Sequence, residues 1–136
     1  MKAKKRLGIW MDHNNAHLME YNTETFKVTT IKAHEEDPQI IDELKKTEKH
    51  IQNKESQSRQ QYYKNLMDAI KNYDEVLLYG PTSAKTELFN LIKKDHKFDN
   101  LFIETKSGDK MSFAEQHAFI KNYFSKLLNA VNPLYA

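Results

Sequence analysis

Two short apolar runs in the second half of the chain constrain its fold most. Residues 75–79 (EVLLY) and 101–103 (LFI) are almost wholly apolar, which is typical of strands buried on both faces. After the first run, a Gly80-Pro81 step stops the strand, and leucine and isoleucine then recur at helical spacing. Strands joined through a helix lie parallel in one sheet, so the two runs are predicted to be parallel neighbours.

The first third of the chain predicts three strands joined by tight turns. Residues 7–12, 16–21 and 26–31 are rich in β-branched and aromatic residues, which favour strands. The intervening Asn14-Asn15 suits a hairpin because asparagine tolerates positive φ. Sequential strands with short connections form an antiparallel meander.

Together these patterns predict one α/β domain spanning residues 1–136. Three antiparallel strands followed by two parallel ones give a ribonuclease-H-like mixed five-stranded sheet in the order 3-2-1-4-5, with flanking helices. At this length a domain buries roughly two thirds of its unfolded surface, which is enough for one core.

Two longer amphipathic helices are expected. Residues 58–73 place apolar side chains on one face, and a C-terminal helix begins at the capping box formed by Ser112 and Glu115 and ends at Asn132-Pro133. The expected apolar stripe of the first is Tyr62, Leu66, Met67, Ile70 and Tyr73, and that of the second is Phe113, His117, Ile120, Phe124, Leu127, Leu128 and Val131.

Residues 34–56 differ from the rest of the chain. Nearly half of them are ionised and few are apolar, so this segment is predicted to be a charged, mobile loop. A marginal helix over residues 38–49 is the alternative. Long loops of this kind inside compact domains are often functional.

Composition excludes several classes of protein. The chain has no cysteine and therefore no disulfide or thiolate metal site. It has no apolar run of the roughly 18 residues that span a membrane and no secretory signal pattern, so a cytoplasmic location and no membrane partner are expected. The net charge of +2 is too small to indicate nucleic-acid binding by itself, and the basic N-terminus (MKAKKR) is read as a solvated end.

A metal-dependent nuclease is the first enzymatic possibility, since this sheet order suits carboxylates on neighbouring strands. Asp12 ends the first strand, but Tyr79 is followed by Gly80-Pro81 and no carboxylate. One carboxylate does not hold two divalent ions, and Asp12 also suits a role as cap of the following turn. A hydrolase or nuclease of the ribonuclease-H-like class therefore stays an alternative, with no catalytic residue assigned.

The histidines and glycines predict no cofactor. His13, His17 and His34 are interpreted as surface or hairpin residues, and His117 as a core histidine, because a metal site needs three or more converging ligands. Three glycines in the whole chain give no phosphate-binding loop. No metal ion and no cofactor is expected.

The turn after residues 75–79 is a candidate anion site. Thr82 and Ser83 lie at the start of a predicted helix, at the carboxyl end of a parallel strand, and Lys85 adds a positive charge. Helix N-termini attract anions through free N–H groups and the helix dipole. An ordinary capped helix start is the alternative.

The segment from Gln57 to Leu88 resembles the middle domain of archaeal and eukaryotic class-1 translation release factors and of Pelota. In that family a long helix follows a Gly-Gly-Gln loop, and a later helix begins with Lys-Thr-Glu-Leu, as Lys85-Thr86-Glu87-Leu88 does here. Gln57 takes the position of the catalytic glutamine, while Glu55 and Ser56 replace the glycines. The resemblance therefore implies a translation-related module without ester hydrolysis.

The chain is also similar to small standalone bacterial relatives of that domain, described as translational-machinery or host-attachment proteins. The matching segments are residues 9–13 (IWMDH), 80–85 (GPTSAK) and 110–112 (KMS). The resemblance implies association with the ribosome or structured RNA, without catalysis and with the oligomeric state open. The residues expected to contact RNA are Lys45, Lys46, Lys49, Lys54, Gln57, Arg59 and Lys64.

Overall fold

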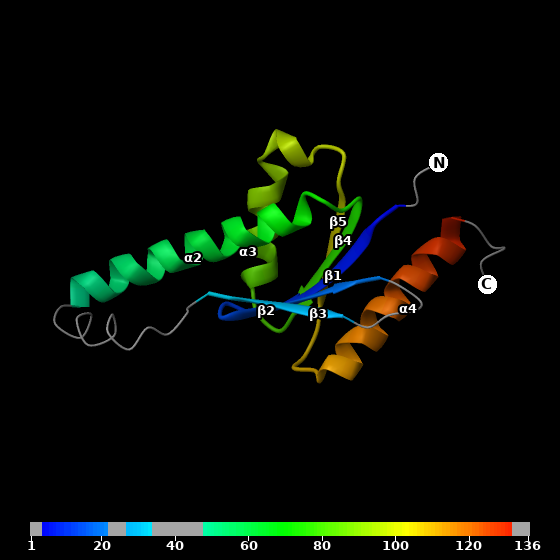
Figure 1. Cartoon of the computed structure of the whole chain (residues 1–136), viewed down its shortest axis with the longest axis horizontal. Coiled ribbons are helices and arrows are strands. Elements are labelled where there is room, and N and C mark those ends of the chain that lie inside the picture. Colours follow the sequence, from blue (N-terminus) through cyan, green and yellow to red (C-terminus); the bar gives the residue numbers. More distant parts are fainter. Residues whose placement is uncertain (1–3, 22–26, 34–47, 132–136) are drawn as a thin grey trace.

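The computed structural model describes residues 4–21, 27–33 and 48–131, without the side chains of 48–56 and 129–131. The described part contains a five-stranded sheet in the order β3-β2-β1-β4-β5 (Figure 1). Its strands are β1 (Arg6–Met11), β2 (Asn15–Glu20), β3 (Val28–Lys32), β4 (Glu75–Gly80) and β5 (Phe102–Ser107).

The strand directions agree with the sequence patterns. β1, β2 and β3 pair antiparallel, whereas β1 pairs parallel with β4 and β4 pairs parallel with β5. The predicted mixed α/β sheet and its order 3-2-1-4-5 are therefore confirmed. The strand that follows residue 100 is longer than the LFI run, since polar residues continue it to Ser107.

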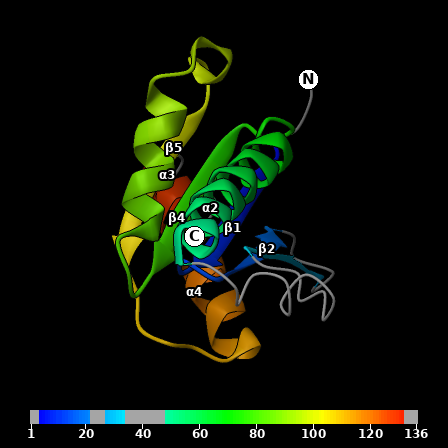
Figure 2. The same cartoon turned by 90° about the vertical axis from the view of Figure 1, so that its left-hand side faces the viewer.

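In the described part of the chain, three helices cover the two faces of the sheet, as Figures 1 and 2 show. α2 (Glu48–Ile70) and α3 (Ala84–Lys93) lie on one face, and α4 (Phe113–Val131) lies on the other. A short 3-10 helix, η1 (His96–Phe98), follows α3. None of the described helices is long and apolar enough to cross a membrane.

Strand β4 contributes to both cores because its side chains alternate between the faces. Val76 and Leu78 join the core beneath α2 and α3, whereas Leu77 and Tyr79 join the core beneath α4. All four side chains are fully buried. This double burial explains why the strand could be recognised as an apolar run.

The first long helix differs from its prediction. α2 begins at Glu48, well before the expected start at Ser58, so residues 48–56 are helical and do not belong to a loop. Residues 34–47, with Lys45 and Lys46, lie outside the described residues. The position that the family resemblance assigns to a catalytic loop, Gln57, therefore lies inside a helix.

The N-terminal half of α2 extends past the strands, away from the sheet (Figure 1). Among the described side chains of this helix, Gln57 to Gln61 are exposed or half-buried, and Tyr62 is the first buried one. The apolar spacing from Tyr62 onward correctly located the packed half. Apolar spacing could not reveal the N-terminal extension of the helix, because that part extends beyond the described strands.

The C-terminal helix is capped as predicted. Glu115 N donates to Ser112 Oγ and Ser112 N donates to Glu115 Oε1, both at 3.2 Å. The predicted stripe is shifted, however, since Phe113 is 48% exposed and His117 is half-buried. Among the described side chains of this helix, the buried ones are Gln116, Ile120, Tyr123 and Phe124.

Gln116 is a polar residue on the buried face of α4, and both ends of its side-chain amide are hydrogen-bonded. Its amide nitrogen donates to Met111 O at 2.9 Å, so its oxygen accepts from His17 Nδ1 at 3.1 Å. The His17 ring also stacks on Trp10, with ring centroids 5.1 Å apart. His17 thus anchors α4 to the sheet, a role that the reading of it as a surface histidine missed.

Candidate functional site

The carboxyl ends of β1 and β4 meet where the chain direction across the sheet reverses. The chain leaves β1 toward β2 on one side, and leaves β4 toward β5 on the other. Open α/β sheets bind ligands preferentially at such a switch point. Gly80 permits the close approach of the two ends, because it has φ +150° and a Cβ there would collide with the Met11 carbonyl oxygen.

A group of polar and aromatic side chains gathers at this edge from β1, α2 and α3. We call it the carboxyl-edge cluster, and it consists of Asp12, His13, Tyr62, Tyr63, Ser83 and Glu87. Residues 9–13 and 80–85, which are far apart in the sequence, contribute to it. Segments far apart in the sequence thus meet at one point.

Asp12 closes the turn that follows β1. Its Oδ1 accepts from Asn14 N at 2.8 Å and from Asn15 N at 2.7 Å. The backbone oxygen of Asp12 in turn accepts from the hydroxyl of Tyr62 at 2.9 Å. The interpretation of Asp12 as a turn cap is therefore confirmed, and its carboxylate is engaged within the chain.

Glu87, in the first turn of α3, is the centre of the cluster. Its Oε2 lies 2.9 Å from His13 Nε2 and accepts from Ser83 Oγ at 3.2 Å, while its Oε1 accepts from the Tyr63 hydroxyl at 2.9 Å. The contact with His13 is the largest cause that lowers the pKa of Glu87, and the Tyr63 and Ser83 hydroxyls add to it against the opposing effect of burial. Glu87 is thus held as a carboxylate and is a poor general acid.

The two tyrosines tie α2 to this edge. Their rings lie side by side, with centroids 5.6 Å apart. Burial raises the pKa of both, and for Tyr63 the bond to Glu87 raises it further while the charge of Arg59 opposes the rise. Both hydroxyls therefore stay protonated and donate to their acceptors at neutral pH. The carboxyl-edge cluster therefore joins α2, the end of β1 and α3 through side-chain contacts.

The predicted anion site lies beside the carboxyl-edge cluster, and its polar side chains form hydrogen bonds within the chain. Lys85 Nζ donates to Gly80 O at 3.0 Å and to Thr82 O at 2.6 Å. Thr82 Oγ1 accepts from Ala84 N at 3.2 Å, and Ser83 Oγ donates to Glu87. An anion bound here would have to displace these contacts and approach the Glu87 carboxylate. Anion binding by Thr82, Ser83 and Lys85 stays a prediction.

The predicted RNA-contacting residues fall on α2 where they are described. Gln57 and Lys64 are exposed and, seven residues apart, share the face opposite the buried Tyr62–Leu66–Ile70 stripe. Arg59 is exposed on the other side of the helix, close enough to Tyr63 to affect its pKa. Lys49 and Lys54 lie on the same helix, without described side chains.

Within the described ranges, no group of three or more His, Asp or Glu side chains could hold a metal ion. The nuclease alternative therefore gains no support from this part of the molecule. His13 pairs with Glu87, as set out above, and His34 lies outside the described residues. His96 is exposed and lies 3.3 Å from Asp99.

The sequence interpretation missed the pairing of His13 with Glu87 and the two tyrosine hydroxyl bonds. One available signal was positional, since His13 follows β1 and Glu87 follows β4. The carboxyl ends of adjacent parallel strands meet at one edge, so polar residues just beyond them are expected to be neighbours. Tyr62 and Tyr63 gave no such signal, because apolar spacing accounts for the ring of a tyrosine and not for its hydroxyl.

Sequence comparison finds no protein-family model and no curated protein that matches the chain. Structural comparison finds the same fold in Pelota proteins of two archaea. The chain superposes on Pelota of Thermoplasma acidophilum with a TM-score of 0.59 at 14% identity, covering 93% of this chain and 35% of that one. For Pelota of Archaeoglobus fulgidus the TM-score is 0.52 at 9% identity, with 98% and 37% covered.

The chain therefore has the fold of one region of Pelota and spans about a third of the length of these proteins. A similarity to an archaeal translation termination factor, with a TM-score of 0.44 at 12% identity, covering 96% of this chain and 42% of that one, is too distant to add an argument. At such identities the comparisons define the fold, and the residues of this chain must carry any statement about its function.

Proposed function

We propose that this domain binds structured RNA, with the ribosome as its main target, through the projecting half of α2, and that it does not hydrolyse peptidyl-tRNA. The observation that carries the proposal is the polar helix extension beyond the sheet, which bears exposed Gln57 and Arg59, with Lys64 exposed at the start of the packed half. The Pelota fold and the release-factor resemblance of residues 57–88 support the same target.

The arrangement of α2 suits contact with a large partner. The hydroxyl bonds of Tyr62 and Tyr63 hold its packed half against the end of β1 and α3. The extension therefore projects from a firmly held part of the helix. Arginine and lysine bind phosphate oxygens, and each such contact releases counterions from the nucleic acid. We therefore expect RNA binding that weakens steeply as the salt concentration rises.

The absence of hydrolysis is proposed from the helical conformation of the segment that replaces Gly-Gly-Gln. Glu55, Ser56 and Gln57 lie within α2. Glycines in the family motif permit backbone conformations closed to other residues, whereas Glu55 and Ser56 favour the helix. A helical backbone already hydrogen-bonded along its length leaves little freedom for Gln57 to enter a reaction centre.

Co-sedimentation with ribosomes over a salt series tests the binding. Arg59→Ala/Lys64→Ala is compared with Lys94→Ala/Lys121→Ala, which removes two exposed cations, one just after α3 and one on α4. We expect the first pair to weaken binding and to reduce the slope of log affinity against log salt by about 0.7–0.9 for each lost phosphate contact. Equal effects of both pairs would show that binding depends only on net charge.

Peptide release from programmed ribosomes tests the missing catalysis. We expect no release by the natural chain or by Gln57→Ala. Release by the natural chain that Gln57→Ala abolishes would contradict the proposal. Glu55→Gly/Ser56→Gly restores the family glycines at a cost of about 1 kcal/mol of helix stability per glycine relative to alanine, so its circular dichroism is measured alongside.

A further inference from the structure

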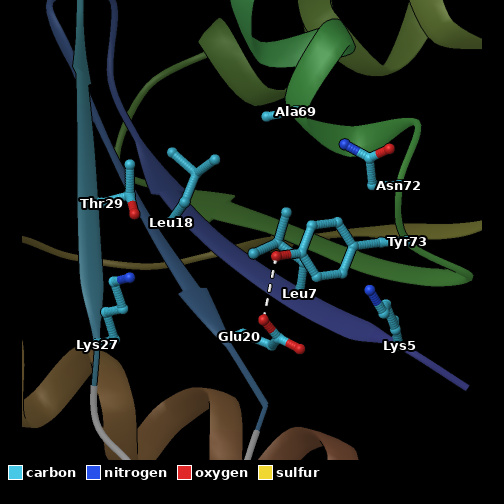
Figure 3. Close-up of a pocket in the computed structure, with 9 residues that line it drawn as sticks. All are labelled: Lys5, Leu7, Leu18, Glu20, Lys27, Thr29, Ala69, Asn72 and Tyr73. Atoms are coloured by element: carbon cyan, nitrogen blue, oxygen red, sulfur yellow. Dashed lines mark hydrogen bonds between the residues drawn. The ribbon is translucent and has the colours of Figure 1, made fainter. Parts of the chain in front are cut away.

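A second surface feature lies at the opposite end of β1 from the carboxyl-edge cluster. It is an open cavity of about 500 Å³ bounded by the start of β1, the end of β2, β3 and the end of α2 (Figure 3). This volume is within the range of roughly 300–1,000 Å³ that small-molecule sites occupy. Its lining residues are Lys5, Leu7, Leu18, Glu20, Lys27, Thr29, Ala69, Asn72 and Tyr73.

The cavity has an apolar floor. Leu7 of β1 and Leu18 of β2 belong to the core and are almost fully buried. Ala69, in the last turn of α2, and Tyr73, three residues beyond the helix, complete the apolar lining (Figure 3). The ring of Tyr73 is only half-buried. An aromatic face beside two leucines offers a flat apolar surface to a planar group.

Two positive charges stand at the rim without a partner. Among the described residues, Lys4 and Arg6 approach Glu75 at 3.7 and 2.6 Å, whereas no ion pair or side-chain hydrogen bond is formed by the ammonium groups of Lys5 and Lys27. The two lysines enter from opposite sides of the cavity (Figure 3). The Glu20 carboxylate is drawn between them, so an anion would bind at one of the lysines on the rim, away from Glu20.

Neutral and acidic hydrogen-bonding groups complete the lining. Thr29 and Asn72 are exposed and offer both donors and acceptors. Glu20 accepts from the Tyr73 hydroxyl at 3.3 Å, which contributes to the raised pKa of Tyr73 after burial and the Glu20 charge. One carboxylate thus stands against two ammonium groups, so the cavity stays electropositive.

We propose that this cavity binds a nucleotide, with its phosphate at Lys27 on the rim and its base against Tyr73 and the leucine floor. A bare phosphate would leave the apolar floor uncovered, and a fatty acid would leave Thr29 and Asn72 without partners. A nucleotide satisfies all three parts, since bases stack on aromatic rings and carry donors and acceptors at their edges. The site is independent of the RNA-binding proposal, because it lies at the other end of α2.

Titration of the ¹⁵N-labelled full chain with nucleoside 5′-monophosphates tests the site, with inorganic phosphate and unphosphorylated nucleosides as comparisons. We expect chemical-shift changes at Leu7, Leu18, Ala69 and Tyr73, and tighter binding of the monophosphate than of either part. A short single-stranded oligonucleotide distinguishes the sources: tighter binding than the monophosphate indicates an unpaired RNA nucleotide, and equal or weaker binding indicates a free nucleotide.

Three variants make the test specific. Lys27→Ala, at an exposed position, should weaken monophosphate binding by about tenfold through loss of one charge-assisted bond. Thr29→Trp should abolish binding by filling the cavity without changing charge. Lys121→Ala, on the exposed side of α4, should leave the affinity unchanged.

The proposal is overturned if inorganic phosphate binds as tightly as the monophosphates and Thr29→Trp has no effect, because binding would then be to surface charge alone. The same conclusion follows if no cavity residue shifts at millimolar nucleotide. Ribosome co-sedimentation of Lys27→Ala separates the two proposals, because this variant should bind nucleotide about tenfold more weakly and still sediment with ribosomes as the natural chain does.

Discussion

The two ends of β1 place polar residues in opposite circumstances. At its carboxyl end, the side chains of the carboxyl-edge cluster bind one another, with Glu87 alone receiving three contacts. At its amino end, Lys5 and Lys27 border an open cavity and form no ion pair within the described residues. A group of His, Glu and Tyr side chains suggests catalysis, but here these side chains bind one another and connect α2, the end of β1 and α3. The less conspicuous end retains unsatisfied charge and space for a ligand.

The comparison predicts that changes at the carboxyl end cost stability, beginning with Gly80→Ala. The new Cβ would meet the Met11 carbonyl oxygen at a φ of +150°, which L-residues rarely adopt. The junction of β4 with β1 must then move, and we expect a loss of at least about 3 kcal/mol in the free energy of unfolding, measured with urea.

Gly108→Ala is the matched control for that change. A Cβ at Gly108 would lie 3.3 Å from the Tyr79 ring and 3.4 Å from Gly80 N, so small shifts of its neighbours would accommodate it. We expect a loss below about 1 kcal/mol. Equal losses in the two variants would show that the conformation of Gly80 is not what joins the strand ends.

Tyr62→Phe should give the next largest effect. The ring is 1% exposed and keeps its packing in the variant, but the Asp12 carbonyl oxygen loses the hydroxyl donor. A fully buried acceptor left without its partner costs about 1–3 kcal/mol, and we expect the lower part of that range from thermal or chemical unfolding because this bond is only partly buried. Tyr63→Phe should cost less, because Glu87 keeps two other contacts. A larger loss for Tyr63→Phe would contradict the expectation that the hydroxyl bond of Tyr62 contributes more to stability than that of Tyr63.

Glu87→Gln should have a smaller effect that depends on pH. The pKa of Glu87 is lowered from its ordinary value of 4.5 in the folded state, so its carboxylate stabilises the fold above that pH and loses the contribution as the pH falls through the folded-state pKa. We expect a loss of about 1 kcal/mol at pH 7, allowing for partial exposure. The difference between natural chain and variant should shrink in acid, as urea unfolding at several pH values measures. If the difference in the free energy of unfolding between natural chain and variant does not change with pH, Glu87 does not contribute to the pH dependence of stability.

Buried regions could be predicted from the sequence because burial leaves a periodic record. β4, with Val76 to Tyr79 inside, and the packed half of α2 from Tyr62 were both located by apolar spacing, and the strand order followed from their connections. The extension of α2 to Glu48 was not predicted, because a helical segment that packs on none of the described strands needs no apolar stripe. Gln116 was missed for the related reason that a buried amide does not register as apolar.

The functional clusters were harder to predict because they depend on contacts between distant segments. In the sequence, β2, β3, α2 and β4 lie between His13 and Glu87. The parallel pairing of β1 with β4 brings the two residues together. The cavity at the other end requires the amino end of β1, two meander strands and the last turn of α2 at once. None of its lining residues forms a sequence motif.

The smallest effect on stability is expected from the cavity itself. Lys27→Ala removes an exposed cation without an ion pair, so the free energy of unfolding should change by no more than about 0.5 kcal/mol. The same variant should show the tenfold loss of nucleotide affinity proposed above, whereas Tyr62→Phe should lose stability and keep that affinity. Unfolding and nucleotide titration of both variants complete the test. If Lys27→Ala destabilises the fold as much as Tyr62→Phe does, Lys27 has a structural role and the contrast between the two ends of β1 fails.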